Sequence, residues 1–575
     1  MAVTLPSEIL FMVLDNLGEE KDYNSLYQCA LASKHFTDHA LAVLYRIYDA
    51  SPLRGGGAED EQLRAQARRT VYTGSREEQN PTLRKWITLW RSIVLSTLDL
   101  TYLPYYSYIR YLDLDDLGNL LGTGSAVKDQ LFTPELLEFV SQEYVSEGNK
   151  RRRSPRTLPD NESIKVKFGS GQFSVSSTFG SYLFLEAIVQ KNAMLRGMSC
   201  DVAPTILNEW IEVSPQLQSL TVWSGTALSQ RAGEKIREHC PDFRQLRIYI
   251  WQDKAPAKAE IEAEELFNAL PPNSLEYFEV LSFSHLGPRS IKALATQKDS
   301  LTELKLTSLT IDTIRELPSL TPLPQLEVLS LTDSAPAAWD EQFDTTLGEV
   351  ADWIGTCPKL KHLEVRRFMN DSRLLTKALM HDEIRLTGLS FAGFKLAEGF
   401  NFLYDLKGHT SLQYLYLRGE GSPDPSHNNL LVESIATLNE LRELELKDVS
   451  DCFTMEQAGE LTMSLLNLER LWISGEAYND SIWPAFSCLS KLKSLAVYAL
   501  SNFTADGVVD FISQLGPGNQ GFSLSILNAT SAFSFPDEVQ AMIREILAGS
   551  LDGSFDFGLA QEEFSDPDSE IELSD

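Results

Sequence analysis

The feature that most restricts the fold of this chain is a leucine pattern that returns many times. From residue 217 to 527 the motif L-x-x-L-x-L, with conservative exchanges, recurs a dozen times. Its middle apolar residues, such as Leu304, Leu444 and Leu471, follow one another at an average spacing of about 28 residues. A unit of this length cannot bury its apolar face alone. The pattern therefore predicts a stack of repeats in which each repeat covers its neighbour.

This period is typical of leucine-rich repeats. We expect residues 201–550 to form an α/β solenoid, a horseshoe with parallel strands on its concave side and helices on its convex side. We expect residues 101–200 to form irregular repeats, with a degenerate repeat around residues 164–168. The basic run 150–156 in this region is either a nuclear-localisation or anion-binding patch or a solvated loop.

The first fifty residues have a different pattern. Ile9, Leu10, Val13, Leu14 and Leu17 recur at helical spacing, and two further short apolar runs follow before residue 50. Three helices in so short a segment make a very small core, so we expect a partner to stabilise it. We expect residues 51–100 to form a polar linker followed by a connecting helix. In this range a glycine-rich, charged stretch precedes an amphipathic stretch.

The N-terminal segment resembles an F-box. The resemblance rests on Leu5-Pro6-Ser7-Glu8-Ile9-Leu10 and on Ser33-Lys34-x-Phe36, and it covers about 45 residues. Ala32 stands where the family usually has valine. The resemblance implies that residues 1–50 dock onto a Skp-type adaptor through Leu5, Pro6, Glu8, Ile9, Leu10, Leu14, Leu17, Leu26, Ser33, Lys34 and Phe36. A helical cap on the repeat array is the structural alternative.

Together with the repeats, the chain resembles fungal F-box proteins with leucine-rich repeats. That resemblance implies a substrate-recognition subunit of a Skp-cullin-F-box ubiquitin ligase, in which the adaptor connects the chain to a cullin scaffold and the repeats bind the target. The alternative is a scaffold outside any ligase that captures a basic protein, since the formal charge is −31. The same charge argues against nucleic acid as a partner.

Catalytic and metal-binding motifs are not evident in the sequence. The eight histidines are scattered, and no zinc-protease, nucleophile-elbow or phosphate-loop spacing occurs. We therefore expect neither enzyme activity nor a cofactor or metal. The six cysteines lie far apart, the N-terminus does not resemble a signal peptide, and no apolar run is long enough to cross a membrane. These features favour an intracellular protein in the cytoplasm, the nucleus or both.

Strand alternation predicts which repeat residues face solvent. Positions one and three residues after each middle leucine lie opposite the buried leucines. Aromatic and arginine side chains at such positions are frequent carriers of interface energy. The predicted target-binding residues are Trp223, Arg247, Tyr249, Trp251, Arg366, Tyr416, Arg418 and Trp472. We expect one patch from Trp223, Tyr249 and Trp251, and a second from Tyr416, Arg418 and Trp472.

The C-terminal residues 551–575 differ in composition from the repeats. They carry nine acidic groups and no lysine or arginine, so we expect a disordered tail. Ser565 and Ser569 stand among these acids and are candidate phosphorylation sites.

Overall fold

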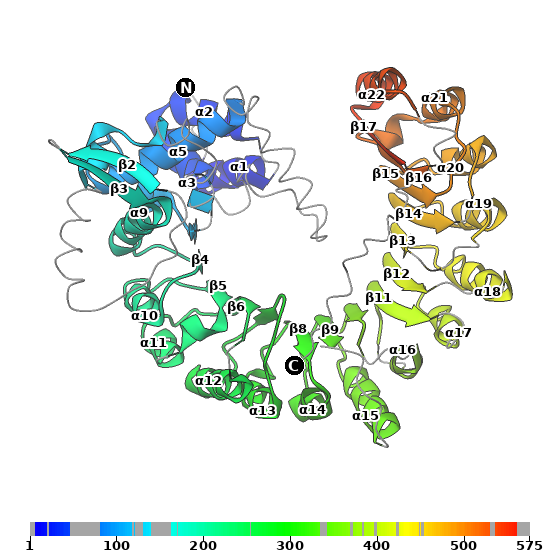
Figure 1. Cartoon of the computed structure of the whole chain (residues 1–575), viewed down its shortest axis with the longest axis horizontal. Helices are drawn as coiled ribbons and strands as arrows, with labels where there is room; N and C mark the ends of the chain where they lie inside the picture. The colour runs from blue at the N-terminus through cyan, green and yellow to red at the C-terminus, as the bar shows by residue number, and fades with distance from the viewer. Residues whose placement is uncertain are drawn as a thin grey trace. The chain divides into compact units, whose positions relative to one another are not determined.

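The computed structural model describes residues 6–19, 22–45, 81–114, 116–117, 120, 130–139, 163–168, 171–229, 231–252, 255–333, 342–368, 372–381, 384–395, 400–420, 425–447, 449, 453–475, 477–529 and 535–559. The chain divides into two compact units, Met1–Leu281 (unit 1) and Ser282–Asp575 (unit 2). In each unit, parallel strands follow one another and helices lie along one side of them (Figure 1). The basic run 150–156 and the two tail serines lie outside the described residues.

Three helices form a small bundle at the start of unit 1. They are α1 (Ser7–Glu19), α2 (Tyr23–Ala32) and α3 (Lys34–Leu44). Asp22 caps α2 by accepting a hydrogen bond from the backbone N–H of Ser25 at 3.0 Å. The buried core of the bundle consists of Leu10, Leu14, Leu26, Ala40 and Val43. The three helices that the apolar spacing predicted are confirmed.

Unit 1 continues from the bundle into a parallel sheet. Its strands, in spatial order, are β1 (Tyr111–Asp113), β4 (Gly197–Cys200), β5 (Ser219–Ser224), β6 (Gln245–Ile250) and β7 (Tyr277–Val280). Its further helices are α5 (Pro81–Thr97), η2 (Tyr105–Tyr108), α9 (Ser177–Lys191), α10 (Pro204–Glu212), η3 (Gly225–Leu228), α11 (Ala232–His239) and α12 (Pro256–Ala269). The middle apolar residues of successive strands pair in register, as Met198 does with Leu220 and Leu220 with Leu246.

Aromatic contacts join the bundle to the rest of unit 1. The ring of Tyr45, just after α3, stacks on Tyr105 with a centroid distance of 5.0 Å. Its hydroxyl lies 3.0 Å from the Ser92 hydroxyl of α5. The Tyr108 hydroxyl donates a hydrogen bond to Asp38 of α3 at 3.0 Å. Burial raises the pKa of Tyr45 to about 12, so this hydroxyl keeps its proton at neutral pH.

One predicted repeat of unit 1 is instead a hairpin. Strands β2 (Ser163–Phe168) and β3 (Gly171–Ser176) pair antiparallel with each other and belong to a sheet of their own. The prediction of a degenerate repeat around residues 164–168 is therefore wrong. Ile164, Val166 and Phe168 alternate as any strand does, and alternation alone does not distinguish a hairpin from a repeat strand.

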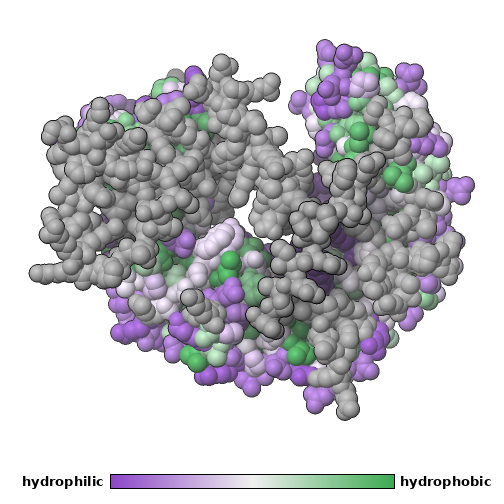
Figure 2. Space-filling model, viewed as in Figure 1, coloured by the Kyte–Doolittle hydropathy of each residue, from purple (hydrophilic) through white to green (hydrophobic). Residues whose placement is uncertain are grey.

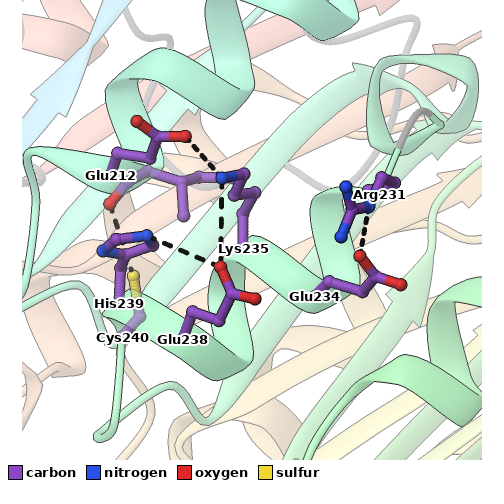
Figure 3. A network of polar contacts seen from close by, with 8 residues as sticks. Glu212, Arg231, Glu234, Lys235, Glu238, His239 and Cys240 are labelled. Atoms are coloured by element: carbon purple, nitrogen blue, oxygen red, sulfur yellow. Dashed lines mark hydrogen bonds and ion pairs between the residues drawn. The ribbon is translucent and has the colours of Figure 1, made fainter.

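Ion pairs connect neighbouring helices of unit 1. Lys235 of α11 lies 2.7 Å from Glu212 of α10 and 3.9 Å from Glu238 (Figure 3). The hydrogen bond between Lys235 and Glu212 raises the pKa of Lys235 and lowers the pKa of Glu212. At the end of α11 the Cys240 thiol is buried 3.5 Å from the backbone oxygen of Ser214, and burial raises its pKa to about 12. Cys240 therefore remains a protonated thiol and fills space between repeats.

Unit 2 repeats the strand and helix alternation. Its strands are β8 (Glu303–Leu309), β9 (Val328–Asp333), β10 (His362–Arg366), β11 (Gly388–Lys395), β12 (Tyr414–Glu420), β13 (Glu443–Lys447), β14 (Arg470–Gly475), β15 (Ser494–Ala499), β16 (Ser523–Ala529) and β17 (Ser554–Leu559). Its helices are α13 (Pro288–Leu294), η4 (Ala295–Gln297), α14 (Ile311–Glu316), η5 (Leu317–Leu320), α15 (Phe343–Gly355), α16 (Ser372–Leu379), α17 (Phe402–Leu406), α18 (Pro425–Ile435), α19 (Met455–Ser464), η6 (Asp480–Ile482), α20 (Trp483–Ser487), α21 (Ala505–Gln514), η7 (Pro517–Asn519) and α22 (Asp537–Leu551).

The leucine pattern and the strand register of unit 2 agree. Leu415 pairs with Leu389 on one side and with Leu444 on the other, and Leu444 pairs in turn with Leu471. All four side chains are at most 2% exposed. Because each strand buries the same positions, the leucines form continuous rows between the strands and the helices. The expected repeat fold with parallel strands is thus confirmed within each unit.

The sheet of unit 2 extends beyond the predicted start of the tail. Strand β17 pairs with β16 in parallel, although residues 551–559 were expected to be disordered. Phe555 is buried, and the Phe535 ring stacks on Phe557 with a centroid distance of 4.8 Å. These aromatic side chains supply the apolar contacts that a count of acidic residues overlooks. Residues 560–575 lie outside the described part of the chain.

No helix in the described ranges is both long enough and apolar enough to cross a membrane.

A buried histidine in unit 2 predicts how stability changes with pH. His409 is 6% exposed, its Nε2 lies 3.1 Å from the backbone oxygen of Leu379, and burial lowers its pKa from 6.5. The native state therefore binds this proton more weakly than the unfolded state does. The contribution of His409 to the free energy of unfolding is present above pH 6.5 and is lost as the pH falls through the lowered pKa.

We expect His409→Gln to show a smaller loss of stability between pH 7 and pH 5 than the wild type, measured by urea unfolding at both values. Burial also lowers the pKa of His362. His362 should therefore preserve part of the dependence of the unfolding free energy on pH in the variant. An equal change in the free energy of unfolding between pH 7 and pH 5 in the two proteins would contradict this role of His409.

Candidate partner-binding surfaces

The N-terminal bundle exposes large apolar side chains on two of its helices. Ile9, Met12 and Val13 form a stripe along α1, and Tyr27 and Leu31 lie one turn apart on α2. Met12 is 66% exposed and Leu31 is 65% exposed. The two helices pack against each other through the bundle core. We call these five residues the bundle patch. Exposed apolar clusters of this kind are typical of protein-binding sites.

Several predicted adaptor-binding residues lie inside the bundle instead of on its surface. Leu10, Leu14 and Leu26 are at most 1% exposed, and Leu17 and Phe36 pack partly buried against them. These side chains hold the helices together. They support a binding surface without being part of it, because a buried side chain has no solvent-accessible area that a partner could cover.

The remaining residues of the predicted adaptor-binding set lie at the surface or outside the described part. Pro6, Ile9, Ser33 and Lys34 are exposed, Leu5 lies outside the described residues, and so does the side chain of Glu8. The sequence-based set does not include the exposed Met12, Val13, Tyr27 and Leu31. Helical spacing could have identified Met12, since it is one turn after Ile9 and opposite the buried Leu10 and Leu14 stripe.

The strands of both units present a second face, opposite the helices, which we call the polar face. It consists of the side chains that alternate with the buried leucines, such as Thr221, Arg247 and Glu279 in unit 1 and Tyr416 and Trp472 in unit 2. The predicted target-binding residues were chosen as members of this face.

In unit 1 the polar face contains one polar triad and one aromatic pair. The Arg247 guanidinium lies 5.3 Å from the Tyr277 ring centroid, donates a hydrogen bond to the Tyr277 hydroxyl at 2.7 Å, and pairs with Glu279. Burial raises the pKa of Tyr277, so this phenol remains neutral. Trp223 and Tyr249 stack with a centroid distance of 4.9 Å and an interplanar angle of 25°. The structure thus brings two of the three members of the first predicted patch together.

Trp251, the third member, does not lie on this face. Its side chain is fully buried, with its ring 6.1 Å from that of Phe267 in α12. A Cβ atom added to Gly225 would come within 2.4 Å of the Trp251 ring, so the glycine makes room for the indole. The prediction of a solvent-facing Trp251 is wrong because β6 ends at Ile250, and alternation does not continue past the end of a strand.

In unit 2 the second predicted patch is divided by acidic side chains. Tyr416 of β12 and Trp472 of β14 are both in register with Glu445 of β13, which stands between them. The Tyr416 hydroxyl donates a hydrogen bond to Glu443, and burial raises the pKa of Tyr416. Tyr416 and Trp472 therefore do not form one continuous aromatic surface.

The cationic residues of this region lie near carboxylates of the same unit. Lys447 is 4.9 Å from the Trp472 ring centroid and 2.9 Å from Glu445. Trp472 also stacks with Tyr498 at 5.8 Å. The remaining predicted target-binding residues are both exposed: Arg366, which pairs with Glu364, and Arg418.

Within the described ranges, no group of three or more histidine, cysteine or acidic residues is arranged to hold a metal ion. The two polar clusters of unit 1, around Lys235 and around Arg247, consist of ion pairs and hydrogen bonds. They connect adjacent repeats, and neither includes a nucleophile paired with a general base.

Comparison with known proteins gives distant structural similarity to solved structures. No family model matches the chain, and no curated protein matches it. Among solved structures, the chain is similar to one described as the crystal structure of a Rad7 and Elc1 complex in yeast, with 15% sequence identity and a TM-score of 0.39. The match covers 61% of this chain and 81% of that one. A likeness this low establishes neither a family nor a shared function.

Proposed function

We propose that this chain is a substrate-recognition subunit of a Skp-cullin-F-box type ubiquitin ligase. In this proposal the N-terminal bundle docks onto a Skp-type adaptor, and the polar face of the repeats holds a target protein. The observation that carries the proposal is the bundle patch, a set of exposed apolar side chains on helices whose sequence resembles an F-box.

Energetics support a partner at the bundle patch. Covering a large apolar side chain removes it from water and stabilises the covered state by about 1.5–3 kcal/mol per fully buried residue. Met12, Val13 and Leu31 are each more than half exposed, so a partner that covers them gains most of that energy. The bundle core is also small, so the same contact would stabilise the bundle itself.

The proposed role needs no bond chemistry within this chain. A ligase subunit of this kind holds its target near a ubiquitin-charged enzyme, and proximity raises the local concentration of the reacting groups. The contacts of Tyr45 and Tyr108 favour this role, because they fix the bundle to α5 and η2 of unit 1. The direction of the adaptor relative to that part of the array is then set by the fold.

The test is capture of a purified Skp-type adaptor by the full-length chain. We expect the double variant Met12→Glu/Leu31→Glu to lose binding by at least a hundredfold, because two charges would have to be buried in an apolar interface. The matched control is Met463→Glu, which changes a side chain of α19 that is 69% exposed. The control should bind the adaptor as the wild type does.

Adaptor binding by the double variant at wild-type affinity would reject the bundle patch as the docking site. A wild-type chain that fails to bind any Skp-type adaptor would reject the ligase assignment. It would favour the alternative of a scaffold that captures a basic protein without a ligase.

A further inference from the structure

The Trp223–Tyr249 pair is an accessible aromatic surface on the polar face of unit 1. Trp223 is 47% exposed and stacks on Tyr249 with a centroid distance of 4.9 Å. Among the described residues, none accepts a hydrogen bond from the Trp223 indole N–H. Figure 2 shows hydrophobic side chains, in green, among hydrophilic ones, in purple, on the visible surface of the described residues. An indole ring left accessible in this way has one face of π-electrons available to a ligand.

Elsewhere on the polar faces, aromatic rings already bind a cation from this chain, and a carboxylate accompanies it. In unit 1, Arg247 lies over Tyr277 at 5.3 Å and pairs with Glu279. In unit 2, Lys447 lies over Trp472 at 4.9 Å and pairs with Glu445 at 2.9 Å. Both sites combine a ring, a cation and a carboxylate. The cation is attracted by the electron-rich face of the ring and by the negative charge of the carboxylate.

Among the described residues, no lysine or arginine lies over the Trp223 ring. Cys200, the last residue of β4, pairs in register with Val222 of β5, so Asp201 and Trp223, both exposed, each directly follow a member of this pair. No described residue makes a hydrogen bond or ion pair with the Asp201 carboxylate. In unit 2, Lys447 of β13 lies over the indole of Trp472, whereas the residue that follows β4 in unit 1 is the acidic Asp201.

We propose that Asp201, Trp223 and Tyr249 bind an arginine side chain of a partner protein. The guanidinium would stack on the Trp223 ring and donate hydrogen bonds to the Asp201 carboxylate, which completes the arrangement seen at the two other sites. The formal charge of −31 complements a basic partner segment and favours its approach. The inference rests on the proposed function in that it takes the polar face as the surface that holds the target.

The test uses the full-length chain and two synthetic peptides. The probe is a fluorescently labelled acetyl-Gly-Leu-Arg-Leu-Gly-amide, and its control has citrulline in place of arginine, which has nearly the same shape and no charge. Fluorescence anisotropy measures both affinities. We expect the arginine peptide to bind about tenfold more tightly than the citrulline peptide, and its binding to weaken as salt is raised from 50 to 500 mM.

Three variants locate the site. Trp223→Leu and Asp201→Asn should each reduce the affinity for the arginine peptide about five- to tenfold. Tyr404→Leu, which removes an exposed aromatic ring from α17 of unit 2, should leave the affinity unchanged. Equal affinity for the two peptides, no binding at about 1 mM peptide, or unchanged binding by the first two variants would each overturn the inference.

Failure here is distinguishable from failure of the proposed function. The adaptor would contact the bundle patch and not Trp223, so Trp223→Leu should capture the adaptor as the wild type does. Loss of peptide selectivity with intact adaptor capture rejects only the arginine site. Intact peptide selectivity without any adaptor capture rejects only the ligase assignment.

Discussion

Replacing Leu26 with alanine is expected to unfold the N-terminal bundle and to abolish adaptor binding. Leu26 is fully buried at the centre of a core with four other buried residues. Removing a buried leucine side chain costs about 2–5 kcal/mol, which is comparable to the whole stability of a bundle of this size. Hydrogen exchange measured by mass spectrometry should show loss of protection across α1, α2 and α3, with unchanged protection in the strands of unit 2.

The matched control is Leu31→Ala on the same helix. Leu31 is 65% exposed, so its loss should leave the protection of the bundle unchanged while it weakens adaptor binding. The pair therefore separates the residues that build the bundle from those that would contact the partner. Full adaptor binding by Leu26→Ala, or unfolding of the bundle by Leu31→Ala, would contradict this division.

Replacing Asp116 with alanine is expected to destabilise the helix that follows the bundle. Asp116 is 4% exposed, and its carboxylate accepts hydrogen bonds from the indole N–H groups of Trp86 at 3.0 Å and Trp90 at 2.8 Å, both in α5. The alanine variant would leave two indole donors without this acceptor, at a cost of about 2–4 kcal/mol.

Asp116→Asn is the control for this prediction, because its amide oxygen can still accept a hydrogen bond. The opening free energy of α5, measured by native-state hydrogen exchange, should fall much less in the asparagine variant than in the alanine variant. Equal opening free energies in the two variants would show that these hydrogen bonds do not hold α5 in place.

The repeat fold could be predicted from the sequence because the buried leucines recur at the period of the repeats. A leucine at every second strand position and at a fixed spacing specifies both the buried face and the register, as the pairing of Leu389, Leu415 and Leu444 shows. The sequence could not locate the ends of strands in the same way. Trp251 follows the alternation of β6 by number, but it lies one residue beyond the end of that strand and packs inside.

The partner-binding surfaces were predictable only in part. An apolar residue in a short helix is expected in the core, so Leu31 resembles a core residue until the packing of the bundle is known, whereas helical spacing places Met12 opposite the buried Leu10 and Leu14. On the polar face, alternation identified Trp223 and Tyr249, and the structure shows that they stack. The proposed role of Asp201 draws on the pairing of Cys200 with Val222, two residues that are 22 positions apart in the sequence.

Docking of a Skp-type adaptor on the bundle patch can be tested by hydrogen exchange of the full-length chain, measured with and without a purified adaptor. We expect new protection within Ser7–Glu19 and Tyr23–Ala32, and unchanged exchange in β5, β6 and β7. Adaptor binding that protects the strands and leaves α1 and α2 unchanged would contradict it.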